Sequence, residues 1–303
     1  MSFQTCNTVT LLNHLTVIRI SGEDAGTFLQ GQLTCDIRNV TENNASIAAF
    51  CNPKGRVIST LLIFKDEAGY GAILPCSLSD TVLQKLRRYV LRSKVLLEDA
   101  SSTDAVLGFH YSQPSPTLGL NSEPLAVTHE PGLTIALPSK GNRFWRVVKR
   151  EALSSLIDTP QTQGFVQDSA HVWRYAEILA GIPWFEIEQS EQFIPQMLNI
   201  DGLGGISFNK GCYTGQEIVA RTHFLGKSKR QLFVAKCDRE IVKDGQLSVL
   251  NSENHEKRGD VLSFQNLNGD CRLLIVLQTI DEEVKRFILD DELNTELTLL
   301  PSE

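Results

Sequence analysis

The sequence predicts an α+β protein that ends in a small closed antiparallel sheet. Strand-like and helix-like segments alternate through the first hundred residues, which is typical of the α+β class. After residue 230 the pattern changes to short apolar runs separated by Gly245, Gly259 and Gly269, and this spacing favours a closed antiparallel sheet. With 303 residues the chain is long enough for two or three domains and a large apolar core.

A β-hairpin is the clearest element of the first hundred residues. Two β-rich runs, 46–50 and 57–64, flank Asn52-Pro53-Lys54-Gly55, which has the residues of a type I turn. The spacing of apolar residues predicts a helix over 81–91. The other expected elements are a strand at 15–20, a short helix at 24–30 that ends at Gly31, and a strand at 95–97.

The rest of the chain predicts a mixture of short elements. Residues 112–138 are rich in Pro, Ser, Thr and Gly, so we expect an irregular connection there. A helix over 171–180 should end at Gly181-Ile182-Pro183, because Pro cannot continue it. The remaining expected elements are a strand at 144–148, a helix at 151–157, and C-terminal strands at 231–236, 246–250, 260–264 and 272–279.

Composition excludes several classes of protein. Hydrophobic residues make up 42% and charged residues 21% of the chain, which is ordinary for a globular protein. No apolar run has membrane-spanning length and no signal peptide begins the chain, so we expect a cytoplasmic protein without a membrane partner. The seven cysteines are scattered and never spaced as C-x-x-C, which predicts free thiols rather than a metal site or an iron–sulphur cradle encoded by the chain.

Cys212 is the most informative residue, and it lies in the segment Asn209-Lys210-Gly211-Cys212-Tyr213-Thr214-Gly215-Gln216-Glu217. Thr214 and Glu217 have the spacing of a capping box, so a helix should begin there with Thr214 as its cap. The start of a helix and the nearby Lys210 both favour thiolate over thiol, although Glu217 opposes them. The alternative is that Cys212 is a small buried hydrophobic residue and that the glycines only permit a tight turn.

A basic window surrounds this cysteine in an otherwise acidic chain. The net charge is −7, yet residues 208–232 hold one acidic residue, Glu217, and five basic ones: Lys210, Arg221, Lys227, Lys229 and Arg230. A second basic cluster lies at 85–94. Such a window beside a reactive residue favours anion binding, and the alternative is that both clusters are solvated faces.

Trp173 is the aromatic candidate for ligand binding. It could stack on a flat heteroaromatic ring, which is worth about 0.5–1.5 kcal/mol beyond buried area, or it could be ordinary helix core. The chain contains no dinucleotide-binding glycine motif, no Walker A sequence, no H-E-x-x-H and no G-x-S-x-G. The common catalytic and nucleotide-binding motifs therefore do not indicate a function.

A longer series of motifs matches one known family in the expected order: Gln30-Gly31-Gln32…Asp36, Lys54-Gly55-Arg56, Trp173…Ala180-Gly181-Ile182-Pro183, Gln192-Phe193-Ile194-Pro195-Gln196, Gly204-Gly205-Ile206-Ser207-Phe208 and Lys210-Gly211-Cys212-Tyr213-Thr214-Gly215-Gln216-Glu217. In these motifs the chain closely resembles the bacterial YgfZ proteins, which are folate-binding relatives of the glycine-cleavage T-protein (aminomethyltransferase). The resemblance spans nearly the whole chain.

The resemblance implies a three-domain α+β fold around a central opening, with a C-terminal β-barrel; the expected domains are 1–110, 111–230 and 231–303. It implies tetrahydrofolate as ligand and a role in maintaining iron–sulphur enzymes, including the enzyme that methylthiolates tRNA. Cys212 matches the family's required cysteine, with Lys210 expected to tune its thiol. The expected folate-binding positions are Trp173, Leu15, Tyr213, Gln216, Glu217 and Arg221.

Two positions depart from the family pattern. Leu15 stands where some members carry a second tryptophan, and Leu179 stands where the superfamily often has a glutamate that binds the pteridine. The basic side chains Arg221, Lys227, Lys229 and Arg230 are candidates for binding the glutamate tail of folate.

The leading hypothesis is a folate-dependent accessory factor for iron–sulphur cluster synthesis or repair, in which one thiol shares any cluster contact with a partner because a cluster needs four ligands. The alternative is a folate-dependent aminomethyltransferase, so whether the protein is an enzyme stays open. That reaction needs a carboxylate at the folate, for which the sequence offers no clear equivalent. Direct binding of RNA is disfavoured, because the chain is acidic and no aromatic and basic platform is visible.

Overall fold

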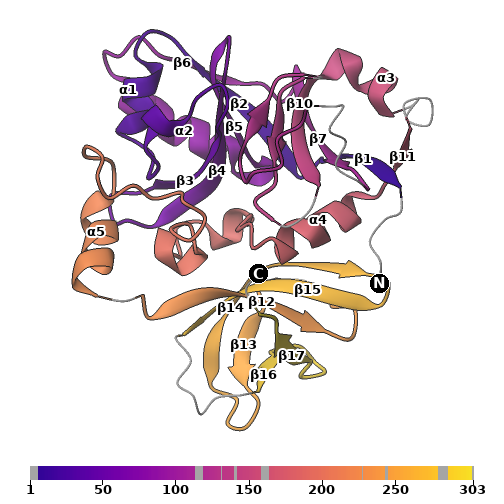
Figure 1. Ribbon diagram of the computed structural model, residues 1–303. Helices are drawn as coiled ribbons and strands as arrows, with labels where there is room; N and C mark the ends of the chain where they lie inside the picture. The colour runs from indigo at the N-terminus through magenta and orange to yellow at the C-terminus, as the bar shows by residue number, and fades with distance from the viewer. Residues whose placement is uncertain are drawn as a thin grey trace.

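In the part of the chain that the structure describes, two open β-sheets lie above a closed six-stranded barrel (Figure 1). The structure is a computed structural model that describes residues 6–112, 119–130, 132–139, 142–157, 164–226, 228–242, 245–278 and 286–301. The α+β class and the closed antiparallel sheet at the C-terminal end are therefore confirmed.

The five-stranded sheet is antiparallel throughout, in the order β3 (Ser46–Cys51), β4 (Val57–Asp66), β5 (Gly69–Pro75), β2 (Leu15–Ser21) and β6 (Leu96–Asp99). The first eight residues of β4 are all buried, which suits a central strand covered on both faces. The predicted hairpin is confirmed: the backbone N–H of Gly55 donates to Asn52 O at 2.9 Å, and Gly55 adopts a φ of +67°. The predicted helices are present as α1 (Ala25–Gln30) and α2 (Ser79–Val90).

The six-stranded sheet has the order β11 (Phe165–Gln167), β1 (Asn7–Leu11), β7 (Asp104–His110), β10 (Arg143–Lys149), β9 (Thr134–Ala136) and β8 (Val127–Thr128). Only β11 and β1 pair in parallel. We expected an irregular connection over 112–138, and this is wrong at β8 and β9, which are strands. Residues 113–118 and 131 of that stretch lie outside the described residues. Because β1 and β7 pair with strands from after residue 110, the expected domain boundary at 110 falls inside this sheet, and the division into domains stays a prediction.

The barrel closes in the order β12 (Arg230–Cys237), β15 (Asp270–Gln278), β14 (Lys257–Leu267), β13 (Ser248–Asn251), β16 (Phe287–Leu289) and β17 (Glu296–Leu299). The four predicted strands correspond to β12 to β15, although Thr279, the last residue of one of them, lies outside the described residues. The sequence analysis missed β16 and β17, which pair with β13 and β12 and so complete the ring. The barrel has an apolar core of its own.

Helix α4 (Ala170–Leu179) lies between the six-stranded sheet and the barrel and contacts β1, β14 and β15 (Figure 1). It begins at Ser169, whose hydroxyl accepts from the backbone N–H of His171, and Gly181 follows its end with a φ of +68°. Helix α5 (Gln216–Leu225) lies at the periphery (Figure 1). The shorter helices are α3 (Leu153–Ile157) and the 3₁₀ turns η1 (Ile37–Asn39), η2 (Cys76–Leu78), η4 (Arg150–Ala152), η6 (Ile187–Gln189) and η7 (Pro195–Leu198).

Candidate functional site

The Cys212 loop, residues 210–217, rests on two segments that are distant in sequence. The ammonium of Lys210 donates to the backbone oxygens of Leu33 at 2.8 Å and Cys35 at 2.7 Å. The backbone N–H of Thr214 donates to the oxygen of Gly31 at 3.2 Å. The motif that begins at Gln30 and the motif that contains Cys212 are therefore neighbours in space.

Two glycines make the other contact, between the Cys212 loop and the β3–β4 turn. Gly215 has a φ of +84°, and a Cβ added there would lie 2.6 Å from Asn52 O and 2.9 Å from the Cα of Gly55. A Cβ on Gly55 would lie 2.8 Å from the Cβ of Ile218. Because real Cβ atoms do not come so close, both positions need glycine for the loop to dock. The Lys54-Gly55-Arg56 motif thus joins the same assembly.

The predicted capping box is wrong. Helix α5 begins at Gln216 after Gly215, and no side chain caps it. The hydroxyl of Thr214 instead donates to Gln32 Oε1 at 3.3 Å, because docking of the loop on the segment after α1 turns Thr214 away from the helix. Gln216 Oε1 accepts from the backbone N–H of Tyr213 at 3.3 Å, which closes the loop from within.

Cys212 itself is exposed, which excludes the alternative of a buried structural cysteine. Four other thiols, Cys35, Cys51, Cys237 and Cys271, are buried. Burial raises the pKa of Cys35 to about 11, so that thiol is held protonated. An exposed thiol on a braced loop is the arrangement in which a cysteine reacts with another molecule.

Lys210 is buried at the base of the Cys212 loop. Its side chain is buried, and its ammonium lies 5.1 Å from the centre of the Tyr213 ring. Burial lowers the pKa of Lys210 to about 8. Its observed contacts hold the loop in place, and a tuning effect on the Cys212 thiol stays a prediction.

Two hollows share part of their walls, and the first of them reaches Asn209, at the start of the Cys212 segment. The first, about 730 Å³, has mainly polar walls that include Asp36, Arg38 and Asn209. The second, about 1040 Å³, runs along the barrel and is lined by Leu179. The two hollows share Pro124, Leu125 and Leu203 and so form one groove. Cys212 lines neither of them.

A buried carboxylate, that of Glu177 on α4, accepts hydrogen bonds from the indole N–H groups of all three tryptophans in the chain. Its Oε1 accepts from Trp145 at 2.9 Å, Trp173 at 3.0 Å and Trp184 at 3.3 Å. Its Oε2 accepts from His14 Nε2 at 2.8 Å, so this nitrogen carries the hydrogen. Glu177 is only 2% exposed, and these four donors replace the water that it loses.

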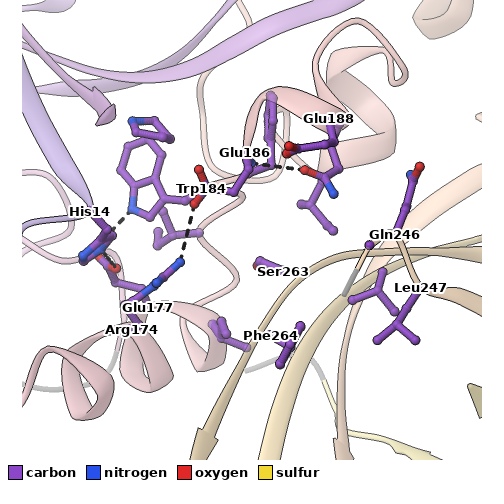
Figure 2. Close-up of a pocket in the computed structure, with 18 residues that line it drawn as sticks. His14, Arg174, Glu177, Trp184, Glu186, Glu188, Gln246, Leu247, Ser263 and Phe264 are labelled. Atoms are coloured by element: carbon purple, nitrogen blue, oxygen red, sulfur yellow. Dashed lines mark hydrogen bonds and ion pairs between the residues drawn. The ribbon is translucent and has the colours of Figure 1, made fainter. Parts of the chain in front are cut away.

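Glu177 lies at the wall of a third hollow, the Glu177 pocket, of about 310 Å³ (Figure 2). All three expected domains contribute to its lining, with His14 from the first, Trp184 from the second and Phe264 from the third. His14 Nδ1 is buried and has no hydrogen-bond partner among the described residues. Arg174 lies 3.6 Å from Glu186, and one arginine and three glutamates, Glu177, Glu186 and Glu188, line the pocket (Figure 2).

The structure separates the predicted site residues into two places. The Cys212 loop and α5 contain six of them: Lys210, Cys212, Tyr213, Gln216, Glu217 and Arg221. Trp173 and Leu15 are buried in the core near Glu177. One face of Trp173 packs on Gly108, where an added Cβ would come within 2.5 Å of the ring. Trp184 rather than Trp173 lines the pocket, and the role of Trp173 at folate stays a prediction.

His14, Glu177 and Trp184 were not predicted from the sequence as site residues. One signal was available, since Trp173 and Glu177 are four residues apart on one helix face and bond to each other. The basic window is exposed at Arg221 and Lys229, whereas Lys227 lies outside the described residues. The second basic cluster is partly neutralised, because Lys85 pairs with Glu191 at 2.6 Å and Lys94 with Glu23 at 2.7 Å.

No group of three or more His, Cys, Asp or Glu side chains in the described part of the chain is arranged to hold a metal ion. No helix within the described ranges is long and apolar enough to span a membrane.

The fold is that of an aminomethyltransferase T. The chain matches the crystal structure of the glycine cleavage system aminomethyltransferase T from Bartonella henselae with a TM-score of 0.76, over 98% of this chain and 86% of that one. The sequence identity is 13%, so this likeness shows the fold alone. It confirms the T-protein-like architecture that the motifs implied.

Sequence relatives define the family, although no family model matches the chain. The chain is 31% identical over 300 residues to tRNA-modifying protein YgfZ of Vibrio atlanticus, covering 97% of this chain and 89% of the relative. It is 35% identical over 269 residues to the protein of that name from Hamiltonella defensa, covering 86% and 80%. With the Escherichia coli protein of that name it shares 32% over 296 residues, covering 95% and 90%. The chain belongs to the YgfZ family.

Proposed function

We propose that this protein is a tetrahydrofolate-binding accessory factor for iron–sulphur cluster synthesis or repair, and that it supports tRNA modification through the enzymes it maintains. The observation that carries the proposal is the state of Cys212, an exposed thiol on a loop that two other motifs hold in place. The relatives named tRNA-modifying protein support the link to tRNA.

The Glu177 pocket is the proposed folate site. A pterin ring presents N–H donors and a flat face, and the pocket presents the carboxylates of Glu186 and Glu188, an aromatic ring at Trp184 and the unpartnered His14 Nδ1. Its volume of about 310 Å³ lies at the lower end of the range for ligand pockets, roughly 300–1,000 Å³. Arg174 at the mouth is a cation for the glutamate tail. When bound, tetrahydrofolate supplies a ring that can carry one-carbon units or reducing equivalents.

The thiol of Cys212 acts as a nucleophile or as a transient ligand. In either role it gives its proton to solvent and donates a sulphur lone pair to the partner. One thiolate leaves the remaining positions of a cluster to other ligands, so the cluster is cargo shared with a partner protein.

A one-carbon transferase is the second candidate, favoured by the T-protein fold alone. That reaction needs a carboxylate free to act at the folate. Glu177 is the buried carboxylate of the pocket, and it already accepts four N–H groups. We expect no methylene-tetrahydrofolate to form from an aminomethyl-lipoyl donor, measured by absorbance after oxidation of the product. Turnover would favour the transferase.

The test of the accessory role compares two exposed cysteines. In cells that lack the native protein, Cys212→Ser should fold normally but fail to restore methylthiolated nucleosides in tRNA, measured by mass spectrometry of digested tRNA. Cys76→Ser is the matched control, because Cys76 is also exposed but lies at the end of β5. Full methylthiolation with Cys212→Ser would refute the role of the thiol.

Folate binding is tested by quenching of tryptophan fluorescence during titration with tetrahydrofolate. Trp184→Phe should weaken binding, because Trp184 lines the pocket. Trp173→Phe should reduce the signal and change affinity less, because Trp173 lines none of the three hollows. Unchanged affinity in Trp184→Phe, with a clear loss in Trp173→Phe, would place the ligand at Trp173 instead.

A further inference from the structure

An exposed aromatic and apolar patch ends α5, the helix that begins directly after the Cys212 loop. Phe224 is 65% exposed and Leu225 is 82% exposed. The rings of Phe208 and His223 stack at 3.7 Å, and Phe224 meets them edge-on at 5.8 Å and 4.8 Å. The other large apolar residues that are well exposed on the described surface are dispersed over both sheets and the barrel, whereas here two of them adjoin an aromatic stack.

The patch is close enough to Cys212 to share one interface with it. Phe208 belongs to the patch through its stacking on His223 and precedes Cys212 by four residues. Four residues of chain span at most roughly 14 Å. A standard protein interface buries roughly 800 Å² on each side, which is a patch about 30 Å across. A protein of ordinary interface size that covers Phe224 and Leu225 is therefore wide enough to span the distance to the thiol.

The charges around the patch indicate what binds there. Arg221 and Lys229 are exposed, and neither has an ion-pair partner among the described residues. Glu217, one turn before Arg221, is the acidic residue of the helix. The chain as a whole is acidic, at −7. A basic rim around an apolar centre complements an acidic face that carries an apolar anchor.

We infer that this patch is the docking surface for the iron–sulphur protein on which Cys212 acts, and that this protein presents an acidic face with an apolar anchor. The inference rests on the proposed function, because it assigns the partner of the same thiol. Docking energy comes from Phe224 and Leu225, whereas Arg221 and Lys229 guide the encounter. Docking and chemistry are thereby assigned to different residues of one surface.

The direct test measures binding of the purified, cluster-bound enzyme that methylthiolates tRNA in the same organism. Phe224→Ser and Leu225→Ser should each raise the Kd at least about tenfold, as expected for anchor residues of an interface. Arg221→Gln and Lys229→Gln should lower the association rate and flatten its dependence on salt. Leu293→Ser, at a residue 67% exposed on the barrel side of the chain, and Arg88→Gln on α2 are matched controls that should bind normally.

Three results would overturn the inference. One is a normal Kd for both Phe224→Ser and Leu225→Ser. A second is that these variants bind the enzyme normally but lose binding to tRNA, which would make the patch an RNA surface. A third is that the wild-type protein dimerises in sedimentation experiments and both variants are monomers, which would make the occupant a second copy of this chain.

Separate variants distinguish this inference from the proposed function. Cys212→Ser should bind the enzyme normally and fail to support methylthiolation, because it docks without a thiol. Phe224→Ser should keep the alkylation rate of Cys212 and fail in both binding and methylthiolation. If Phe224→Ser is active and Cys212→Ser is not, only the docking inference fails. If Cys212→Ser is active, the proposed role of the thiol fails whatever the patch does.

Discussion

Replacement of Glu177 should be the most destabilising single change in the α4 region. In Glu177→Leu the leucine side chain fills a volume similar to that of glutamate, but three indole N–H groups and His14 Nε2 lose their acceptor. Each buried donor without a partner costs about 1–3 kcal/mol. Removing the buried charge returns part of that cost, and breaking a buried network typically costs about 3–5 kcal/mol in total. We expect that value for Glu177→Leu.

Glu177→Gln is the graded companion to this change. Glutamine keeps one carbonyl oxygen for the indoles but offers an N–H₂ group to His14, which then has to change tautomer. His14 Nδ1 is buried without a partner, so the change of tautomer brings no new bond within the described residues. We expect about 1–2 kcal/mol of destabilisation, from the loss of charge-assisted bonds.

The measurement is urea unfolding followed by tryptophan fluorescence, which reports on the network directly because all three tryptophans bond to Glu177. A lower midpoint with an unchanged m-value indicates lost stability. Glu188→Gln is the control, because Glu188 is exposed at the mouth of the same pocket. If the free energy of unfolding of Glu177→Leu is within about 0.5 kcal/mol of the wild-type value, which is the usual range for surface changes, the hydrogen bonds to Glu177 do not stabilise the fold as we infer.

Three further predictions concern the Cys212 loop. The pKa of Lys210 is about 8 in the folded protein, against an ordinary value of 10.5. As the pH rises, the folded state therefore loses this proton before the unfolded state does, and the free energy of unfolding should increase between about pH 8 and 10.5. In urea unfolding, Lys210→Met should lack that increase, whereas Lys229→Met should keep it. Iodoacetamide should modify Cys212 before Cys76, because partial burial raises the pKa of Cys76. Peptide mass spectrometry measures the order of modification, and the reverse order would contradict the assignment of Cys212 as the more accessible thiol. Gly215→Ala should cost about 1–3 kcal/mol from its positive φ alone, and a stable variant with normal alkylation would show that the loop does not need this docking.

Much of the fold could be predicted from local sequence signals. The β3–β4 hairpin has its turn residues side by side, and α2 and α4 have apolar residues at helical spacing. Strand β7 could not be found this way. Its residues are buried, but Gly108 interrupts its apolar run, and the reason for that glycine is the Trp173 ring packed against it. The partner is 65 residues away in the chain, so no local pattern contains it.

The sequence motif singled out Cys212, which is exposed in the structure, whereas the contacts that hold its loop could not be predicted. The motif around Cys212 identified the exposed thiol. The predicted cap at Thr214 failed because its hydroxyl bonds Gln32, which a local rule cannot anticipate. The contacts of Lys210 are also long-range, because its ammonium donates to backbone oxygens before residue 36, and its expected effect on the sulphur stays a prediction. In each case a long-range contact decided the outcome over a short-range propensity.

If folate and the thiol serve one process, ligand in the Glu177 pocket should change the reactivity of Cys212. A chain of bonds offers a path: Gln246 lines the pocket and donates to Gln192 Oε1 at 3.2 Å, and Arg56 donates to Gln192 O at 2.7 Å. Arg56 follows Gly55, on which the loop docks. We expect tetrahydrofolate to change the alkylation rate of Cys212, and Gln192→Ala to reduce that change.

Linkage requires that the effect be reciprocal at equilibrium, so a change at Cys212 that alters the loop should also alter the affinity for folate. The informative measurement is therefore a pair: alkylation rate with and without tetrahydrofolate, and folate Kd for native and alkylated protein. A path carried by Gln192 predicts that both effects shrink together in Gln192→Ala. If folate leaves the alkylation rate unchanged while it binds normally, the pocket and the Cys212 loop are energetically independent, and the proposal that they serve one reaction has to be abandoned even if each site is functional by itself.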